Sequence, residues 1–135
     1  MKLTVGADRL WRDLHVILAA VAAEIEKFDS TLACEVACTS NDAFPVRAYL
    51  AVRRSPTGDE LAVVVDVQAT GDGWSASSDI CTDDGAVVAE GPGATGPAQI
   101  AESPLEHWAA DWVAAVRRFL AEAEGEIRMA AARLS

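Results

Sequence analysis

Apolar and polar residues alternate along five short stretches of the chain between positions 31 and 90. A period of two puts successive side chains on opposite faces of a β-strand, so each stretch is expected to bury one face and leave the other uncovered. Turn residues separate the stretches, and strands joined by about two to five residues pair as an antiparallel meander. The inward side chains are predicted to be Leu32, Cys34, Val36, Cys38, Val46, Ala48, Leu50, Val52, Leu61, Val63, Val65, Val67, Trp74, Ala76, Ser78 and Ile80.

Helical periodicity flanks these stretches on both sides. Apolar residues recur every three or four positions between Asp8 and Phe28, and Asp8 is placed to cap that helix. Further on, Ser103-Pro104-Leu105-Glu106 combines an N-cap serine, a proline at the first helical position and the glutamate of a capping box. The second helix is expected to continue to about Leu134, a length of about 45 Å, so that its last turns overhang the sheet. The apolar residues of this overhang, a candidate dimer contact, are Ile127, Met129 and Leu134.

The predicted fold class is therefore α+β, with the order α-β-β-β-β-β-α. A five-stranded antiparallel meander carries the N-terminal helix and the long C-terminal helix on one face, where the apolar sides of both can be buried together. The chain, residues 1–135, fits a single domain. The Gly-, Pro- and Ala-rich segment 91–102 is expected to be a flexible connection from the sheet to the last helix.

Charge narrows the partners that the chain can bind. Twenty-one acidic and eleven basic side chains give a net charge of −10, while 51% hydrophobic residues indicate an ordered globular protein. Such a charge repels nucleic-acid phosphates and anionic lipid, so neither nucleic acid nor a membrane is an expected partner. A basic protein partner is favoured instead, although the charge also serves simply to keep a small protein in solution.

The sequence also bears on location. Met1–Val5 lacks the apolar core of a signal peptide, and no stretch approaches the roughly 20 apolar residues that span a bilayer. Three cysteines include no Cys-x-x-Cys pair, and the Cα atoms of Cys34 and Cys38, four residues apart on one strand, would lie about 13 Å apart, too far for a disulfide. We therefore expect free thiols and a cytoplasmic protein.

The predicted outer face of the sheet carries the most suggestive cluster of polar side chains. Turn lengths place Arg47 opposite Asp66 and Asp66 opposite Asp79, with Glu35 and Tyr49 beside this row. Two facing carboxylates raise one pKa and a nearby guanidinium lowers another, an arrangement suited to acid–base chemistry. The alternative is that Arg47 neutralises two surface acids, with each exposed pair contributing about 0 to 1 kcal/mol.

Other candidate chemistry is weaker. His15 and His107 fall on polar helix faces, and the spacing of His107 and Asp111 suits a surface pair because no third metal ligand is near. Cys81 falls on the outer face, where neighbouring acids should raise its pKa and make its thiolate scarce. No nucleophile or cofactor motif is present, so the sequence assigns no catalytic residue, metal or cofactor.

Three tryptophans could form an apolar pocket between the sheet and the C-terminal helix. Trp108 and Trp112 lie one helical turn apart, and Trp74 follows a predicted hairpin. These rings would ordinarily be core packing, but several inward residues of the sheet are small, which leaves room for an apolar ligand.

Three functions follow from these patterns. The first is a small, acidic, non-catalytic homodimer that binds another protein through its open sheet face or an edge strand. In size, charge and α+β make-up, though not in any motif, it is similar to secretion chaperones, immunity proteins and adaptors. The alternative is a binding domain for a small apolar ligand near Trp74, Trp108 and Trp112, and a less favoured one is an enzyme that uses Asp66, Asp79 and Arg47.

Overall fold

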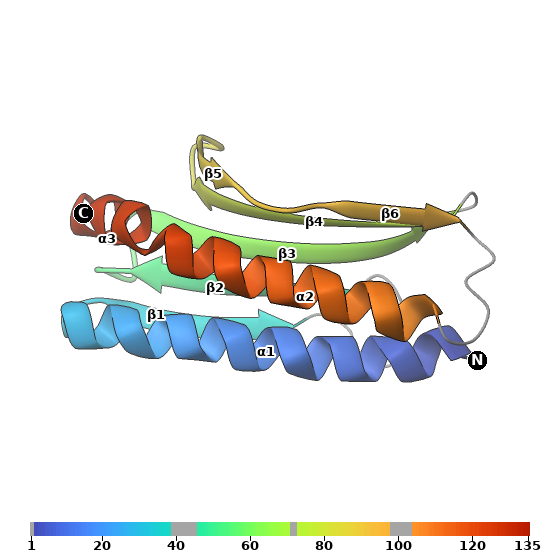
Figure 1. The fold of residues 1–135 in the computed structure, drawn as a ribbon. Helices are drawn as coiled ribbons and strands as arrows, with labels where there is room; N and C mark the ends of the chain where they lie inside the picture. Colours follow the sequence, from blue (N-terminus) through green and yellow to red (C-terminus); the bar gives the residue numbers. More distant parts are fainter. Residues whose placement is uncertain (1, 39–45, 71–72, 98–103) are drawn as a thin grey trace.

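A computed structural model describes residues 2–38, 46–70, 73–97 and 104–135. It confirms the predicted α+β arrangement, an antiparallel sheet whose helices all lie on one face (Figure 1). The elements in chain order are α1 (Lys2–Phe28), β1 (Ala33–Cys38), β2 (Val46–Arg53), β3 (Glu60–Thr70), β4 (Gly73–Thr82), β5 (Val87–Glu90), β6 (Ala94–Pro97), α2 (Pro104–Glu122) and α3 (Glu124–Ala132).

The strands are neighbours in the order β1-β2-β3-β4-β5, as a meander requires. The sixth strand, β6, also pairs with β4, and it does so on the same side as β5. β5 pairs with Asp79–Cys81 and β6 with Gly73–Ala76, so the two short strands share one edge of the sheet. Part of the segment expected to be a flexible connection is thus a strand, while residues 98–102 of that segment lie outside the described residues.

Specific contacts hold residues 91–93, the link between β5 and β6, in place. The carbonyl oxygen of Pro92 accepts hydrogen bonds from Ser78 Oγ at 2.9 Å and from Trp112 Nε1 at 3.0 Å. At Gly91, a Cβ atom would lie 2.4 Å from Ser78 Oγ and 2.5 Å from the ring of Phe119, so only glycine lets the link pass this close. These contacts fasten the link to both β4 and α2.

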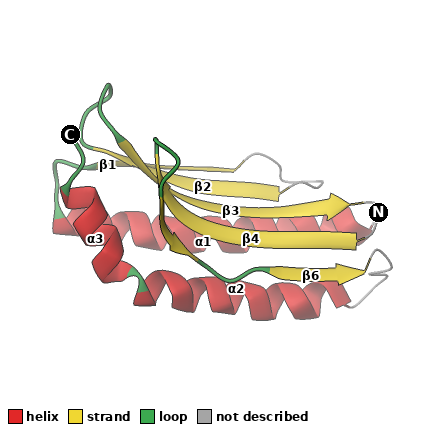
Figure 2. Cartoon of the chain, turned by 90° about the horizontal axis from the view of Figure 1, so that it is seen from above, coloured by secondary structure: helices red, strands yellow, loops and turns green. Residues whose placement is uncertain are grey.

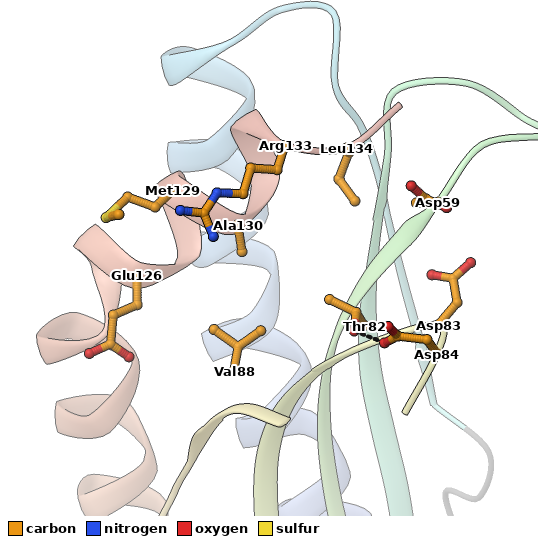
Figure 3. Close-up of a pocket in the computed structure, with 10 residues that line it drawn as sticks. All are labelled: Asp59, Thr82, Asp83, Asp84, Val88, Glu126, Met129, Ala130, Arg133 and Leu134. Carbon is orange, nitrogen blue, oxygen red and sulfur yellow. Dashed lines mark hydrogen bonds between the residues drawn. The ribbon is translucent and has the colours of Figure 1, made fainter. Parts of the chain in front are cut away.

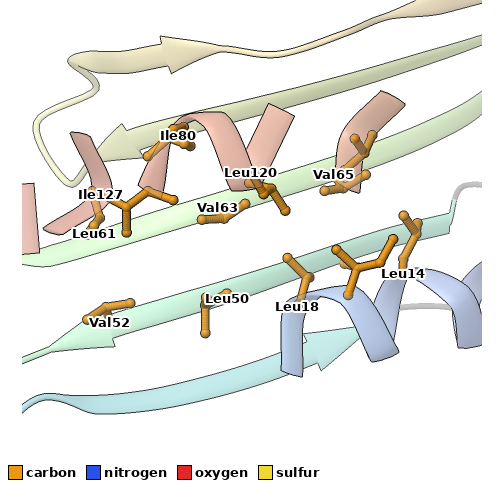
Figure 4. Close-up of a cluster of buried hydrophobic side chains, with 14 of the residues drawn as sticks. Leu14, Leu18, Leu50, Val52, Leu61, Val63, Val65, Ile80, Leu120 and Ile127 are labelled. Atoms are coloured by element: carbon orange, nitrogen blue, oxygen red, sulfur yellow. The ribbon is translucent and has the colours of Figure 1, made fainter. Parts of the chain in front are cut away.

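The core lies between the helices and the inner face of the sheet (Figure 4). The strand pattern predicted this layer correctly, because Ala48, Leu50 and Val52 of β2, the predicted inward residues of β3 and Ile80 of β4 are all buried. Full burial of one such side chain stabilises the fold by about 1.5–3 kcal/mol. The residues at its centre with 0% exposure include Leu14, Leu18, Leu50, Val52, Leu61, Val63, Val65, Ile80 and Val116.

The first helix begins earlier than the sequence suggested. It begins at Lys2, which places Asp8 inside the helix, so the predicted N-cap at Asp8 is wrong. Residues 2–7 contain no proline and only one glycine, so nothing there interrupts a helix. Its end at Phe28 is where the helical periodicity of the sequence also ends.

The C-terminal helix is bent, and the expected single overhanging helix is wrong. A break at Ala123 separates α2 from α3, which turns toward the sheet and packs against β5 (Figure 2). Backbone hydrogen bonds continue through the bend, from Ala123 N to Phe119 O and from Ile127 N to Ala123 O, each at 2.9 Å. The bend leaves Ile127 and Leu134 only 2% and 7% exposed, so burial of the apolar positions at the end of the sheet favours it.

Arg54 fixes the end of α3 in this position. Its guanidinium donates to the backbone oxygen of Leu134 at 3.0 Å, to that of Ala131 at 3.4 Å and to Asp29 Oδ2 at 3.0 Å. Asp29 also accepts from the hydroxyl and the backbone N–H of Thr31, at 2.6 and 2.9 Å. These hydrogen bonds, first those of Thr31 and then that of Arg54, lower the pKa of Asp29 to about 2.

Candidate functional site

The candidate site is the outer face of the sheet, defined as the face opposite α1, α2 and α3. Both views of the chain show the helices on one side only, so this face is uncovered by any described element (Figures 1 and 2). The strand pairing arranges its side chains in rows that cross the strands, because residues opposite one another in a sheet point to the same side.

One row, named here the central row, crosses all of β1 to β5. Its members in order are Ala37, Tyr49, Val64, Asp79 and Glu90. Tyr49 and Val64 are neighbours in the middle of the sheet and are each half-buried. The row therefore changes from an apolar half on β1 to β3 to a half with two adjacent carboxylates on β4 and β5.

A second row, the alanine row, lies beside the central row. It consists of Glu35, Ala51, Ala62, Cys81 and Val87. Its middle is made of small side chains, and its last member, Val87, is 62% exposed. Together the two rows form an apolar strip that has Glu35 at one edge and Asp79 and Glu90 at the other.

The third row tests the prediction that Arg47, Asp66 and Asp79 lie side by side across the outer face. Arg47 does lie opposite Asp66, as expected, but the next residue in the row is Ser77 rather than Asp79. Asp79 instead faces Val64, so the predicted pairing of Asp66 with Asp79 is wrong by two residues. β3 and β4 continue to Thr70 and Gly73, which fixes a register that alternation alone could not.

Among the remaining predicted outer-face residues, Glu35 lies apart from Arg47. Glu35 faces Ala51, on the far side of the central row from Arg47. Asp66 accepts a hydrogen bond from Gln68 Nε2 at 2.7 Å, within its own strand. The structure thus brings Tyr49 and Asp79 onto one row and Arg47 and Asp66 onto another, and it does not gather two carboxylates and a guanidinium at one point.

The cysteines are poorly placed to act as nucleophiles. Burial raises the pKa of the Cys81 thiol, and the charges of Asp79 and Glu60 raise it further. Burial, followed by the charge of Glu26, raises the pKa of Cys34 to about 11. Both thiols are free and carry little thiolate at neutral pH, while the side chain of Cys38 lies outside the described part.

Trp112 belongs to the core. Its side chain is 4% exposed, and its indole N–H is bonded to Pro92. The side chains of Trp74 and Trp108, which with Trp112 would form the predicted apolar pocket, lie outside the described part of the chain. Of the histidines, His15 stacks on Trp11 with ring centroids 5.8 Å apart, and the side chain of His107 is also outside the described part. Within the described ranges, no group of His, Cys, Asp or Glu could hold a metal ion, and no helix is both long and apolar enough to cross a membrane.

The bend of α3 creates a groove of about 660 Å³ that the sequence did not reveal (Figure 3). Two of its acidic residues accept hydrogen bonds from neighbouring turns: Asp84 accepts from the Thr82 hydroxyl and from Ala86 N, which lowers its pKa, and Asp83 accepts from Glu60 N. These carboxylates therefore shape the turns. The lining residues are Asp59, Thr82, Asp83, Asp84, Val88, Glu126, Met129, Ala130, Arg133 and Leu134.

Comparison with known proteins gives no match to a protein family, to a curated protein or to a solved structure. The function is therefore argued from the geometry and charge of the chain itself.

Proposed function

We propose that this chain is a non-catalytic protein-interaction module whose outer sheet face binds a basic segment of a partner protein. The central row is the observation that carries the proposal. It sets Tyr49 and Val64 side by side in the middle of an uncovered face and continues into Asp79 and Glu90. A partner with apolar side chains flanked by lysine or arginine matches both halves of the row.

The distribution of charge favours the sheet and its turns, rather than α1, as the region that attracts a basic partner. Residues 31–97 carry ten acidic and three basic side chains, whereas α1 carries four of each. Most of the negative field therefore originates on the sheet and its turns. Such a field raises the rate at which a basic partner reaches this side of the molecule, and it does so most strongly at low ionic strength.

The carboxylate pair gives a second reason. Asp79 and Glu90 are direct cross-strand partners, and like charges in that position destabilise a sheet. A lysine or arginine of the partner placed between them would remove this repulsion. The free protein thus carries an unfavourable interaction that binding of a cation would relieve.

The remaining features complete the proposal. Free thiols at Cys34 and Cys81 suit the reducing cytoplasm. The helices lie on the opposite side of the sheet, so two chains can associate through them while both outer faces stay open. The module is accordingly proposed to be a cytoplasmic homodimer with two equivalent partner sites.

Photo-crosslinking tests the outer face directly. A benzophenone amino acid in place of Tyr49 is expected to capture a partner in the native cell, whereas the same group in place of Met129, 60% exposed on α3, is expected not to capture that partner. Mass spectrometry identifies the captured chain. Capture of the same set of proteins from both positions would contradict binding at the outer face.

Charge reversal then tests the chemistry with the purified partner. Asp79→Lys combined with Glu90→Lys is expected to raise the dissociation constant about tenfold or more at low salt, and less at high salt. The matched control reverses Asp111 and Glu122, which are exposed on α2, and changes the net charge by the same amount. An equal loss of affinity in both variants would show that only total charge matters and would overturn the assignment of the site.

A further inference from the structure

The first strand, β1, forms one edge of the sheet. It pairs with β2 along its whole length, and on its other side it pairs with no strand in the described part of the chain (Figure 1). Every second residue of an edge strand directs its backbone N–H and C=O groups away from its neighbour. The six residues of β1 contain neither proline nor glycine, so this row of donors and acceptors is unbroken. It matches the backbone of one further strand.

The opposite edge of the sheet is built differently. There β5 and β6 are each four residues long, Gly91–Gly93 separates them, and the register of β4 with β5 shifts between Ile80 and Cys81. Short strands, proline and bulges are the features by which sheets avoid pairing at their edges. β1 has none of these features, and its one charged side chain is that of Glu35. The contrast favours β1 as the edge that is available for pairing.

The apolar layer beneath the sheet is incomplete at β1. Cys34 and Val36 point inward but are only half-buried, whereas the inward residues of β3 have no exposed surface. Trp11 and Ala22, about three turns apart on α1, are also half-buried at the margin of the core. This flank of α1 faces β1, because burial and then the charge of Glu26, one turn after Ala22, raise the pKa of Cys34 to about 11. The inward side chains of an added strand would cover this margin.

The charge that is left unpaired along this edge is negative. Glu26 on the helix side and Glu35 on the outer side are both exposed, and neither forms an ion pair within the described ranges. The nearby Arg53 and Arg54 are each paired with an acid of the chain. A hollow of about 240 Å³ beside Glu35 has room for a long side chain. The edge therefore attracts a segment with lysine or arginine and repels a second copy of charge −10.

We propose that the edge of β1 binds an extended, basic segment of a partner protein as an additional strand of the sheet. The backbone of the segment pairs with β1, and its apolar side chains cover Cys34 and Val36. Lysine or arginine at alternate positions pairs with Glu35, and one at the helix side pairs with Glu26. This surface is separate from the central row, so the inference goes beyond the outer face and does not rest on it.

A synthetic nine-residue peptide that alternates valine and lysine is the probe. Its affinity for the full chain is measured by calorimetry at low salt. A peptide of the same composition, with its valines and lysines in two blocks, is expected to bind at least about tenfold more weakly, because it cannot present one apolar and one basic side. Methylation of the amide nitrogens of every second residue removes the donors from one edge of the peptide only. Of the two peptides methylated in this way, one is expected to lose about tenfold or more in affinity and the other to retain it.

Hydrogen exchange and charge reversal locate the peptide on the chain. Its binding is expected to slow amide exchange in β1 and to leave β6 unchanged. Glu26→Lys combined with Glu35→Lys is expected to raise the dissociation constant about tenfold at low salt. The matched control reverses Asp111 and Glu122, which are exposed on α2, and changes the net charge by the same amount. Circular dichroism verifies that each variant is folded.

Several results would overturn the proposal. They are equal affinities of the alternating and block peptides, equal affinities of the two methylated peptides, and equal weakening by the two charge reversals. Slowed exchange in β2 and β3 without β1 would place the peptide on the outer face instead. A doubled mass with slow exchange in β1 in the absence of peptide would mean that a second copy occupies the edge. Photo-crosslinking from position 49 reports on the outer face separately, so failure at the edge leaves that test intact.

Discussion

Asp79 and Glu90 face each other directly across β4 and β5 on the outer face. Replacing one carboxylate by the neutral amide of the same shape removes a cross-strand repulsion. Asp79→Asn is therefore expected to raise the free energy of unfolding by about 0.2–1 kcal/mol at neutral pH and low salt. Urea denaturation measures the change, and high salt should reduce it. A loss of stability would mean that Asp79 makes a favourable contact in the free protein.

The lowered pKa of Asp29 predicts how the stability of the fold depends on pH. Its pKa falls from 3.8 to about 2 in the folded chain, because Thr31 and Arg54 hold the charged form. A lowered pKa stabilises the fold at pH values above the unfolded pKa, and this contribution disappears as the pH falls through the folded value. The difference in unfolding free energy between the native chain and Asp29→Asn should be constant above about pH 5 and shrink between about pH 4 and pH 2. A constant difference down to pH 2 would contradict the assignment.

Ser78 and Trp112 are expected to be coupled through the oxygen of Pro92 that both contact. Ser78→Ala alone should lower the unfolding free energy by about 1 kcal/mol, since the indole still donates to that oxygen. Trp112→Phe should cost more, because it also removes buried volume. In the double variant the oxygen loses both donors, so the loss should exceed the sum of the single losses. Chemical denaturation of the native chain, the two single variants and the double variant measures these losses. If the two single losses simply add up to the loss in the double variant, the two hydrogen bonds are independent.

Cys81 should react slowly with iodoacetamide at neutral pH, because burial and nearby carboxylates raise its pKa above 9.0. Asp79→Asn removes one of those charges and is expected to speed the reaction, whereas Asp111→Asn on α2 should leave the rate unchanged. Peptide mass spectrometry separates Cys81 from the other cysteines. A native rate equal to that of an unfolded cysteine would refute the burial effect.

The face of each strand residue was predictable, but its cross-strand partner was predictable only in part. The period of two alone places Val63 and Val65 in the core and Asp66 on the other side, and the structure agrees. Arg47 was matched correctly to Asp66 because the turn between β2 and β3 is symmetric. Asp79 was not, because a shift of two residues keeps every side chain on its face and alternation cannot detect it.

The bend at Ala123 could not be predicted from local sequence. Neither proline nor glycine occupies that position, and alanine favours a continuous helix. The bend depends on tertiary packing, since only a turned α3 brings Ile127 and Leu134 onto the end of the sheet. The groove beside the β4–β5 turn depends on the same bend, so its lining could not be read from periodicity.

The short strands β5 and β6, which both pair with one side of β4, affect whether copies of the chain can associate edge to edge. An incoming chain needs an unbroken ladder of free backbone groups to extend a sheet. Here that border is divided by Gly91–Gly93, and the imide nitrogen of Pro92 has no hydrogen to donate. Addition of strands from other copies is therefore hindered along the β5–β6 edge. This matters for a protein whose outer sheet face is also uncovered.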